Sequence, residues 1–398
     1  MRRYSIKTTF IEMKLNILAA LAAASLTVGT LSAQTIDQAS RRWDAGKLSW
    51  DEFLGESKSD TTINRFAYNV KLSRATEKIG NTTYIYSKFT PYFDQTESWT
   101  HPRFKNDAML QYNQIMFDML ELYARRATID YNHESGEYSD EQIRSFYKRQ
   151  FDKHVQELDE ASRRGTDADQ LPFFATGVAL DLERTHFNPA AVVEDLPVDY
   201  FGEFYAGING HFPISDYYNQ SIGFNLGFGF GWKRHLWSLD MSLGFSGKAK
   251  TDIDTRNGWI YEDEHLNVYQ VYATYAYCAA RNKKYQYFPF VGIGASGITH
   301  PLGDRDLKDP EKDGFSMCAG MMFDVFLIRR VSIHSNWGDL ADATYQAIRI
   351  RPYFSLSQFS DLGWTPAINL SISYNWGGMS WRRKNFRSEE VKSTIHEY

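Results

Sequence analysis

Residues 221–232 read SIGFNLGFGFGW, and the stretch switches between two kinds of residue at every step. Large apolar side chains occupy one parity, at Ile222, Phe224, Leu226, Phe228, Phe230 and Trp232. The other parity holds only Ser, Gly and Asn. Because successive side chains of a strand point to opposite faces, the pattern predicts a β-strand with one large apolar face and one small polar face.

The same alternation recurs through the C-terminal half of the chain. It is found in LWSLDMSLGFSG at 236–247, in INLSISYNW at 368–376, and near 200–210, 267–280, 286–298, 314–326 and 345–356. A soluble sandwich or barrel also alternates in this way. A membrane barrel is favoured because aromatic residues gather at the strand ends, and because the opposite face is too small and polar to form a dry core.

The connections between these runs favour a barrel in an outer membrane. Short basic connections at 233–235, 281–284 and 328–330 alternate with longer ones at 212–220, 248–267 and 300–313. Outer-membrane barrels have short periplasmic turns and long outward loops. We therefore predict an antiparallel transmembrane β-barrel of eight strands over 191–376, followed by a periplasmic tail at 377–398. Ten strands would result if 331–346 held an extra hairpin.

Charged residues on the small face are expected to pair inside the barrel. Parity points five of them inward: Glu203, Asp240, Asp324, Arg349 and Arg351. The interior of an eight-stranded barrel is filled by side chains, and buried charges need partners. Cys278 and Cys318 fall on the same face, on strands that are not neighbours, and we expect them to be packed thiols of the interior.

The beginning of the chain predicts export. Lys14 precedes the apolar run LNILAALAAASLTVGTLSA, which ends in small residues at Ala33, as in a secretory signal peptide over 1–33. Met13 gives a signal of more usual length than Met1. The remainder of the 398 residues is long enough for two domains. The net charge of −5 gives no nucleic-acid footprint, and two Cys are too few for a disulfide scaffold.

Residues 34–190 predict an α+β domain in front of the barrel. The stretch 82–100 indicates one or two strands. Apolar residues then recur at spacings of three and four from Met109 to Tyr123, which predicts a helix capped by Asn106 or Asp107. A second helix with charges on its outer face is expected at 139–163.

Three short patterns in this domain occur in a fixed order. The first consists of Trp43, Leu48, Trp50, Glu52, Phe53 and Gly55. The second is the pair Ser98–Trp99, and the third, within LQYNQIMFDMLELYARR at 110–126, consists of Gln114, Phe117, Asp118, Glu121, Tyr123, Ala124 and Arg125. Over about 40–165, the order and spacing resemble a bacterial family of uncharacterised secreted domains with a zinc-protease-like signature, whose helix reads H-E-Q-x-H-F-D.

The chain departs from that family at the metal ligands. His, Glu and His of the family helix are replaced by Tyr112, Asn113 and Met116, and the candidate third His is replaced by Arg164 in LDEASRRG. Catalytic zinc needs three donors such as imidazole or carboxylate plus a water, and the missing Glu is the general base. The resemblance therefore implies a catalytically inactive helix that is packed rather than metal-bound, with no metal and no catalytic residue.

Asp118 and Glu121, one helical turn apart, are the only carboxylates left on this helix face, and form a possible residual polar site. Two carboxylates alone do not rebuild a zinc site. Glu121 and Arg125 have the spacing of a simple i, i+4 ion pair.

The resemblance and the general character of the sequence suggest a Gram-negative bacterium of the Bacteroides kind. We expect an outer-membrane barrel protein that is not an enzyme, whose periplasmic N-terminal domain has a binding or scaffolding role. No cofactor is expected. The expected partners are outer-membrane lipid and a periplasmic peptide, protein or cell-wall ligand. Two alternatives are left open: surface adhesion through the long barrel loops, and a residual hydrolase with other metal ligands.

Overall fold

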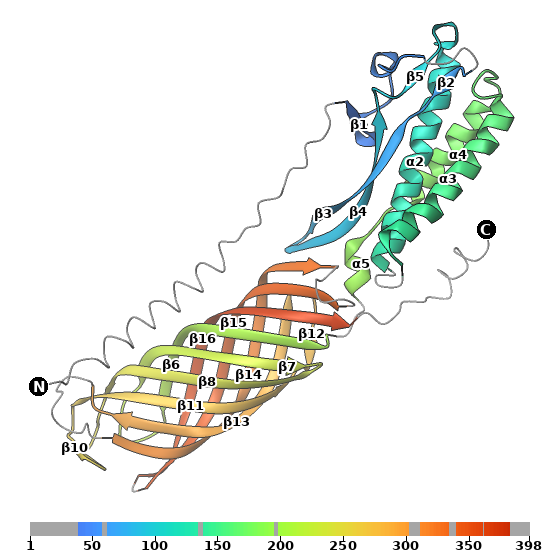
Figure 1. Ribbon diagram of the computed structural model, residues 1–398. Coiled ribbons are helices and arrows are strands. Elements are labelled where there is room, and N and C mark those ends of the chain that lie inside the picture. Colours follow the sequence, from blue (N-terminus) through green and yellow to red (C-terminus); the bar gives the residue numbers. More distant parts are fainter. Residues whose placement is uncertain are drawn as a thin grey trace, which may run out of the picture.

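The computed structural model describes residues 39–57, 62–133, 138–194, 198–301, 311–333, 340–360 and 362–382. The predicted signal peptide at 1–33 and residues 383–398 of the predicted tail lie outside these ranges. Figure 1 shows an elongated molecule, with a helix-and-strand domain at one end and a barrel of long strands at the other. None of the helices in the described ranges is long and apolar enough to span a membrane.

The barrel is a ring of antiparallel strands. Its eight members are β6 (Tyr200–Pro213), β7 (Ser221–Trp232), β8 (His235–Lys248), β11 (His265–Tyr277), β13 (Tyr285–Thr299), β14 (Glu311–Ser332), β15 (Leu340–Phe359) and β16 (Gly363–Arg382). Each pairs with the next in this order, and β16 pairs back to β6, so the ring closes. The barrel that the alternation predicts is therefore present.

Three short strands accompany the ring. They are β9 (Ile253–Thr255), β10 (Gly258–Ile260) and β12 (Ala280–Arg281). The first two form a hairpin within the long connection between β8 and β11. Ile253 and Ile260 of this hairpin are buried in an apolar cluster with Leu266 and Ile298 of the barrel strands. The connection at 249–264 therefore folds back onto the barrel end that lies away from the N-terminal domain.

Two expected strand ends were wrong. Residues 328–330, predicted as a turn, lie inside β14, and β16 continues to Arg382, past the predicted boundary at 376. The hairpin considered for 331–346 is not found among the described residues of that stretch, which belong to β14 and β15 apart from Ile333. The alternation could not show that β14 continues past 330, because part of its pairing there is with Thr82–Ile85, which are far away in the sequence.

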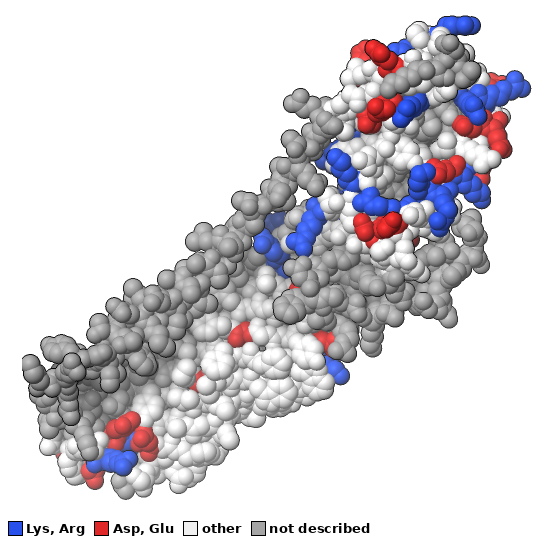
Figure 2. All heavy atoms as spheres, viewed as in Figure 1, with Lys and Arg blue, Asp and Glu red and all other residues white. Residues whose placement is uncertain are grey.

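The outer face of the barrel is apolar. The side chains of Ile222, Phe224 and Phe230 on β7 are 61%, 65% and 57% exposed, and the alternate positions point inward, as predicted. On the visible side of the barrel in Figure 2, charged residues are few between the far loops and the N-terminal domain. An exposed apolar surface that surrounds a closed ring is the surface that lipid requires.

Inward-facing glycines make room for aromatic rings of neighbouring strands. Gly227 of β7 lies opposite Tyr205 of β6. A Cβ atom at Gly227 would lie 2.4 Å from the Tyr205 ring, so only glycine fits beside it. The face made of small residues is therefore covered by large residues from the next strand, and Tyr205 is fully buried.

The predicted inward charges pair at the centre of the barrel. Arg349 donates to both carboxylate oxygens of Glu203 at 2.6 and 2.8 Å, and to both of Asp324 at 2.7 and 2.8 Å. The three side chains are fully buried. Arg351 forms a second pair with Asp240 at 2.6 Å. The interior is thus filled by a paired polar network, as expected of a small barrel.

The N-terminal domain packs a long central helix against a twisted hairpin and two further helices against that central helix. Its strands are β1 (Ser40–Arg42), β2 (Asn64–Arg65), β3 (Tyr68–Ile79), β4 (Thr82–Asp94) and β5 (Trp99–Thr100). Its α-helices are α2 (Asp107–His133), α3 (Asp140–Ser162), α4 (Leu171–Arg184) and the short α5 (Pro189–Glu194), and its 3₁₀ turns are η1 (Trp43–Ala45), η2 (Trp50–Glu52) and η3 (Pro102–Phe104). The two predicted helices are confirmed, and the Asn106 side chain accepts from Met109 N at 2.9 Å as the predicted cap.

A strand of the N-terminal domain continues the barrel sheet. β13 begins at Tyr285, opposite Val325, so β14 has a free edge beyond that point. β4 occupies this edge in parallel orientation, with Thr82–Ile85 opposite Arg329–Ser332. Because unpaired edges are exposed hydrogen-bonding groups, this pairing both satisfies β14 and joins the two parts of the protein.

Replacing Arg349 with Met should destabilise the barrel by about 3–5 kcal/mol, because Glu203 and Asp324 would remain buried without a cation. Urea unfolding of the full chain in detergent micelles, followed by tryptophan fluorescence, measures the change. The control adds Glu203→Gln and Asp324→Asn to Arg349→Met and should recover most of the loss. Wild-type stability of the single variant would contradict a stabilising role for the pairs.

Candidate functional site

Helix α2 is the centre of the N-terminal domain, and the residues of the first pattern surround it. The Trp43 indole donates to Asp118 Oδ1 at 2.7 Å. Leu48 N donates to the side-chain oxygen of Gln114 at 2.7 Å. Phe53 is buried in the same apolar cluster as the helix. The pattern that the sequence shows therefore has a structural role, which is to hold the N-terminal segment onto α2.

The three positions where the family that the sequence resembles has His, Glu and His are buried on α2. Tyr112, Asn113 and Met116 are 5%, 0% and 4% exposed. The Tyr112 hydroxyl donates to Asp159 of α3. The Asn113 amide donates to Met109 O at 2.8 Å and accepts from the Asn64 amide at 2.9 Å. These contacts, together with the apolar cluster around Met116, leave the three side chains fully engaged in packing and hydrogen bonds.

The turn after α3 is brought close to Tyr112, as the alignment of the LDEASRRG stretch requires. Gly165 has a φ of +78°, and a Cβ atom there would lie 2.7 Å from the Tyr112 ring. Arg164 itself points outward, with 78% of its side chain exposed, and its Nε lies 3.9 Å from Asp159. The turn that follows α3 therefore contacts α2 through Gly165, but Arg164 is not directed toward α2.

The two residual carboxylates have separate partners. Asp118 accepts from Trp43 and, at 2.8 Å, from Gln114. Glu121 accepts from Arg125 Nε at 2.8 Å, the i, i+4 pair that the spacing predicts. The Arg125 guanidinium also lies 5.1 Å from the centre of the Trp43 ring. Both carboxylates are therefore committed to holding the N-terminal segment and α2 together.

Burial raises the pKa of three side chains of α2. It raises the pKa of Asp118 above its usual value, against the opposing effect of the Trp43 and Gln114 hydrogen bonds. It also raises the pKa of Glu121, with Arg125 opposing. Burial, and then the Asp159 carboxylate, raise the pKa of Tyr112. Tyr112 therefore remains a neutral phenol near pH 7, which suits its hydrogen bond to the Asp159 carboxylate.

Across the described ranges, no three His, Cys, Asp or Glu side chains gather in a way that could hold a metal ion. His154 of α3 contacts α2, where its Nδ1 is hydrogen bonded to the Tyr123 hydroxyl. His101 caps η3 by accepting from Arg103 N. These imidazoles are thus used within the protein. His133 ends α2, and its sequence neighbour Glu134 lies outside the described residues.

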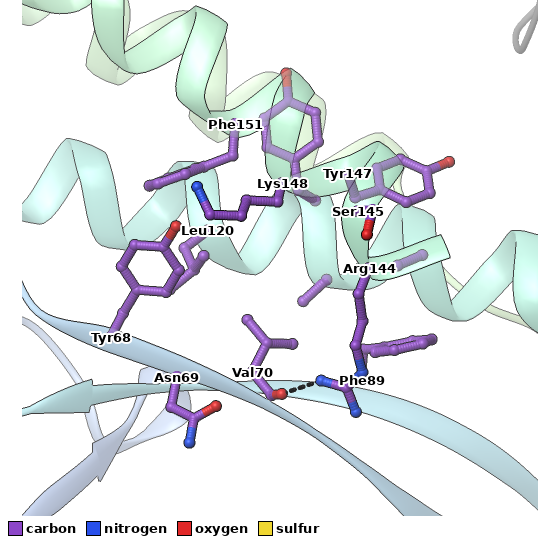
Figure 3. Close-up of a pocket in the computed structure, with 13 residues that line it drawn as sticks. Tyr68, Asn69, Val70, Phe89, Leu120, Arg144, Ser145, Tyr147, Lys148 and Phe151 are labelled. Carbon is purple, nitrogen blue, oxygen red and sulfur yellow. Dashed lines mark hydrogen bonds between the residues drawn. The ribbon is translucent and has the colours of Figure 1, made fainter. Parts of the chain in front are cut away.

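A groove that the sequence did not indicate lies between the hairpin and the helices. Figure 3 shows Tyr68 and Val70 from β3, Phe89 from β4, and Tyr147 and Phe151 from α3 around it. Its volume is about 260 Å³. No local pattern predicts it, because its walls come from four elements separated by long stretches of chain. We call this feature the aromatic groove.

Two cations lie beside the aromatic groove. The Arg144 guanidinium lies 5.1 Å from the centre of the Phe89 ring and donates to Val70 O. Lys148 lines the groove from α3, and its side chain is exposed. Tyr68 and Phe151 meet edge to face, with ring centres 5.1 Å apart. Arg144 lies 3.6 Å from the exposed Asp140, and Lys148 is ion-paired with the exposed Asp152. The groove therefore combines flat apolar faces with cationic donors at its rim, an arrangement suited to a ligand whose carboxylates replace these exposed partners.

Comparisons with known proteins concern the barrel. No protein-family model and no curated protein matches the chain. Among solved structures, the chain is similar to the attachment invasion locus protein Ail of Yersinia pestis, at 12% identity and a TM-score of 0.27, over 45% of this chain and 99% of Ail.

It is also similar to Neisserial surface protein A, at 9% identity and a TM-score of 0.28, over 44% of this chain and 95% of that one. The outer membrane protein OprG of Pseudomonas aeruginosa matches at 11% identity and a TM-score of 0.25, over 47% of this chain and 98% of OprG. Because these TM-scores are low, the barrel is identified from the strand pairing of this chain and not from its similarity to these structures.

Replacing Asp118 with Asn should raise the thermal midpoint of the N-terminal domain by a few degrees at pH 8. The amide oxygen keeps the bonds from Trp43 and Gln114, while the buried charge is removed. Because the pKa of Asp118 is raised in the folded state, the wild-type protein loses stability as the pH rises through that pKa. Below that pKa Asp118 is already neutral, so the gain from Asp118→Asn should be smaller there.

Circular dichroism at 222 nm measures this change, because the helices belong to the N-terminal domain. The exposed Asp169 supplies the control: Asp169→Asn should leave the midpoint unchanged at both pH values. A pH-independent effect of Asp118→Asn would show that burial of the charge is not its cause.

Proposed function

We propose that this is an outer-membrane β-barrel protein that holds a non-catalytic, ligand-binding domain in the periplasm. The apolar outer face of the closed ring supports a membrane location. The barrel end nearest the N-terminal domain has the tight connections at 233–234 and 278–284, while the 249–264 connection lies at the opposite end. Short turns on the periplasmic side are usual in such barrels, which supports a periplasmic N-terminal domain.

The observation that carries the binding role is the aromatic groove. Sugar rings stack on flat aromatic faces, and the stem peptides of cell-wall material carry carboxylates that suit Arg144 and Lys148. A cell-wall fragment therefore matches the groove better than an uncharged peptide. A periplasmic domain fixed to the outer membrane is also in reach of this material.

The packing of α2 supports a role without catalysis. If the resemblance to zinc-protease-like domains reflects ancestry, Tyr112, Asn113 and Met116 fill the former metal pocket. A zinc hydrolase needs an open metal position and a base for its water. Neither Tyr112 nor Asn113 has a free group to offer, because each is hydrogen bonded within the domain.

Surface adhesion is the second candidate, and it rests on a different part of the chain. Trp259 and Tyr261 are 51% and 56% exposed in the far connection, next to the acidic residues at 262–264. Exposed aromatic residues are common at protein interfaces. This candidate predicts that deletion of 256–263 removes binding to a surface, whereas the proposed function predicts no effect on cell-wall binding.

The full chain, purified in detergent, should contain no stoichiometric zinc by plasma mass spectrometry and should not cleave fluorescent casein. The variant with Tyr112→His, Asn113→Glu and Met116→His should gain zinc, because it restores two imidazole ligands at i and i+4 together with the general base. One zinc per wild-type chain together with chelator-sensitive cleavage would establish the residual hydrolase instead. Wild-type metal content is informative even if the triple variant does not fold.

Binding through the aromatic groove can be measured by co-sedimentation of the full chain with purified peptidoglycan sacculi. Wild type should sediment with them. Ser145→Trp should abolish binding, because Ser145 is an exposed groove residue whose replacement fills the space. Lys148→Ala should weaken it several-fold. Lys153, exposed on the same helix outside the groove, provides the matched control, and equal losses for Lys153→Ala would reject a groove-specific contact.

A further inference from the structure

A second cavity lies where the barrel meets the N-terminal domain. Its volume is about 770 Å³. Its walls come from the connections after β7 and β11, from Tyr84 of β4, and from Val193 and Val198 on either side of 194–197. The pairing of β4 with β14 holds these walls together. We call this feature the junction cavity, and it is separate from the aromatic groove, with which it shares no lining residue.

The described lining of the junction cavity is strongly positive. Five lining residues are Lys or Arg, and none is Asp or Glu: Lys233, Arg234, Arg281, Lys283 and Arg329. The buried Asp324 below them is already bonded to Arg349 and to the Gln286 amide. Among the described lining residues, no carboxylate offsets the charges of Arg281 and Arg329. Such a field concentrates anions in the cavity.

Two of the guanidinium groups have buried donors that lack an acceptor. Arg281 uses its Nε to bond Gln286 at 3.0 Å, but its Nη2 is buried with no hydrogen-bond partner among the described residues. The Nε atom of Arg329 is also buried and has no hydrogen-bond partner among the described residues. A buried donor without an acceptor destabilises the fold, and more so when it is charged. Both arginines line the junction cavity, so an anion held there would meet two guanidinium groups whose hydrogen bonds are not all satisfied.

Aromatic rings hold these arginines in place. The Arg281 guanidinium lies 4.9 Å from the centre of the Phe201 ring and 5.9 Å from that of Phe288. The Arg329 guanidinium lies 5.3 Å from the Phe326 ring. Because the planar groups stack on rings, their remaining donors keep fixed directions, which favours the planar or tetrahedral oxygens of a carboxylate or phosphate.

The rest of the lining is apolar. Its apolar residues come from the ends of β14 and β16 and from Val193 and Val198. They are Val193, Val198, Val331, Met379 and Trp381. A free inorganic ion would leave this surface uncovered. The volume is in the range of pockets that enclose organic ligands rather than single ions.

We propose that the junction cavity binds an amphiphilic phosphate, with the phosphate oxygens on Arg281 and Arg329 and an apolar chain against the valine, methionine and tryptophan side. Phosphate fits better than carboxylate because it offers more acceptor oxygens to two separate guanidinium groups. The site belongs to the barrel mouth, and it stands whether or not the N-terminal domain binds cell-wall material.

Isothermal titration of the full chain in a non-ionic detergent, with oleoyl lysophosphatidic acid as the probe, tests this assignment. One saturable site per chain is expected. Arg281→Gln and Arg329→Gln should each weaken binding about tenfold, the usual effect of losing a charge-assisted hydrogen bond. Arg330→Gln is the matched control, because Arg330 is exposed on the same strand outside the cavity and should leave the affinity unchanged.

Two further probes separate the sources of affinity. Lysophosphatidylcholine, which has the same chain and a zwitterionic headgroup, should bind at least tenfold more weakly. Inorganic phosphate should compete only weakly, because it leaves the apolar side empty; competition as strong as that of the lipid would overturn the amphiphilic part of the proposal. Absence of a saturable site, or equal losses for Arg330→Gln and Arg281→Gln, would overturn the site itself.

Arg281→Lys provides a second test of the role of Arg281 in case Arg281→Gln does not fold. It keeps the charge but loses the fork of donors, so binding should fall less than in the Gln variant. Folding of every variant is checked by the shift in electrophoretic mobility between unheated and heated samples. A folded Arg281→Lys protein that binds as tightly as wild type would reject the role assigned to the fork geometry.

Discussion

The backbone pairing between β16 and β6 determines most of this molecule. Inside a bilayer no water is present to satisfy backbone N–H and C=O groups, so a strand-built span must close on itself. Closure gives every strand one lipid face and one inner face, which explains the alternation that begins at Ser221. It also encloses the inner residues, so that Arg349, Glu203 and Asp324 must satisfy one another.

The same requirement explains how the two parts of the protein are joined. β14 is longer than β13 on the side of the N-terminal domain, and the unpaired edge would otherwise be exposed. β4 completes it, and the extended β14 brings Arg329 next to the turn that carries Arg281. The pairing of β4 with β14 therefore satisfies the free edge and also brings together the walls of the junction cavity. The cavity is a product of assembly rather than of either part alone.

Local patterns predicted the features that depend on local periodicity. The lipid face, the inward charges and the cap at Asn106 each follow from residues a few positions apart. Features that depend on distant segments could not be predicted. Thr82 and Arg329 are paired although the chain between them is long, and Tyr112 meets Asp159 through the packing of two helices. β3 was missed: Tyr68, Val70 and Leu72 alternate with polar residues, but the remainder of the strand is mainly polar and exposed, so the alternation is short.

Parallel pairing of β4 with β14 has a mechanical consequence. A pull on the N-terminal domain away from the membrane acts along the axes of the paired strands, so their hydrogen bonds are loaded together in shear instead of opening one after another. A load borne by several bonds at once is resisted far better than sequential unzipping. The register from Thr82 to Ile85 thus lets a load on the N-terminal domain pass through backbone hydrogen bonds into the barrel wall.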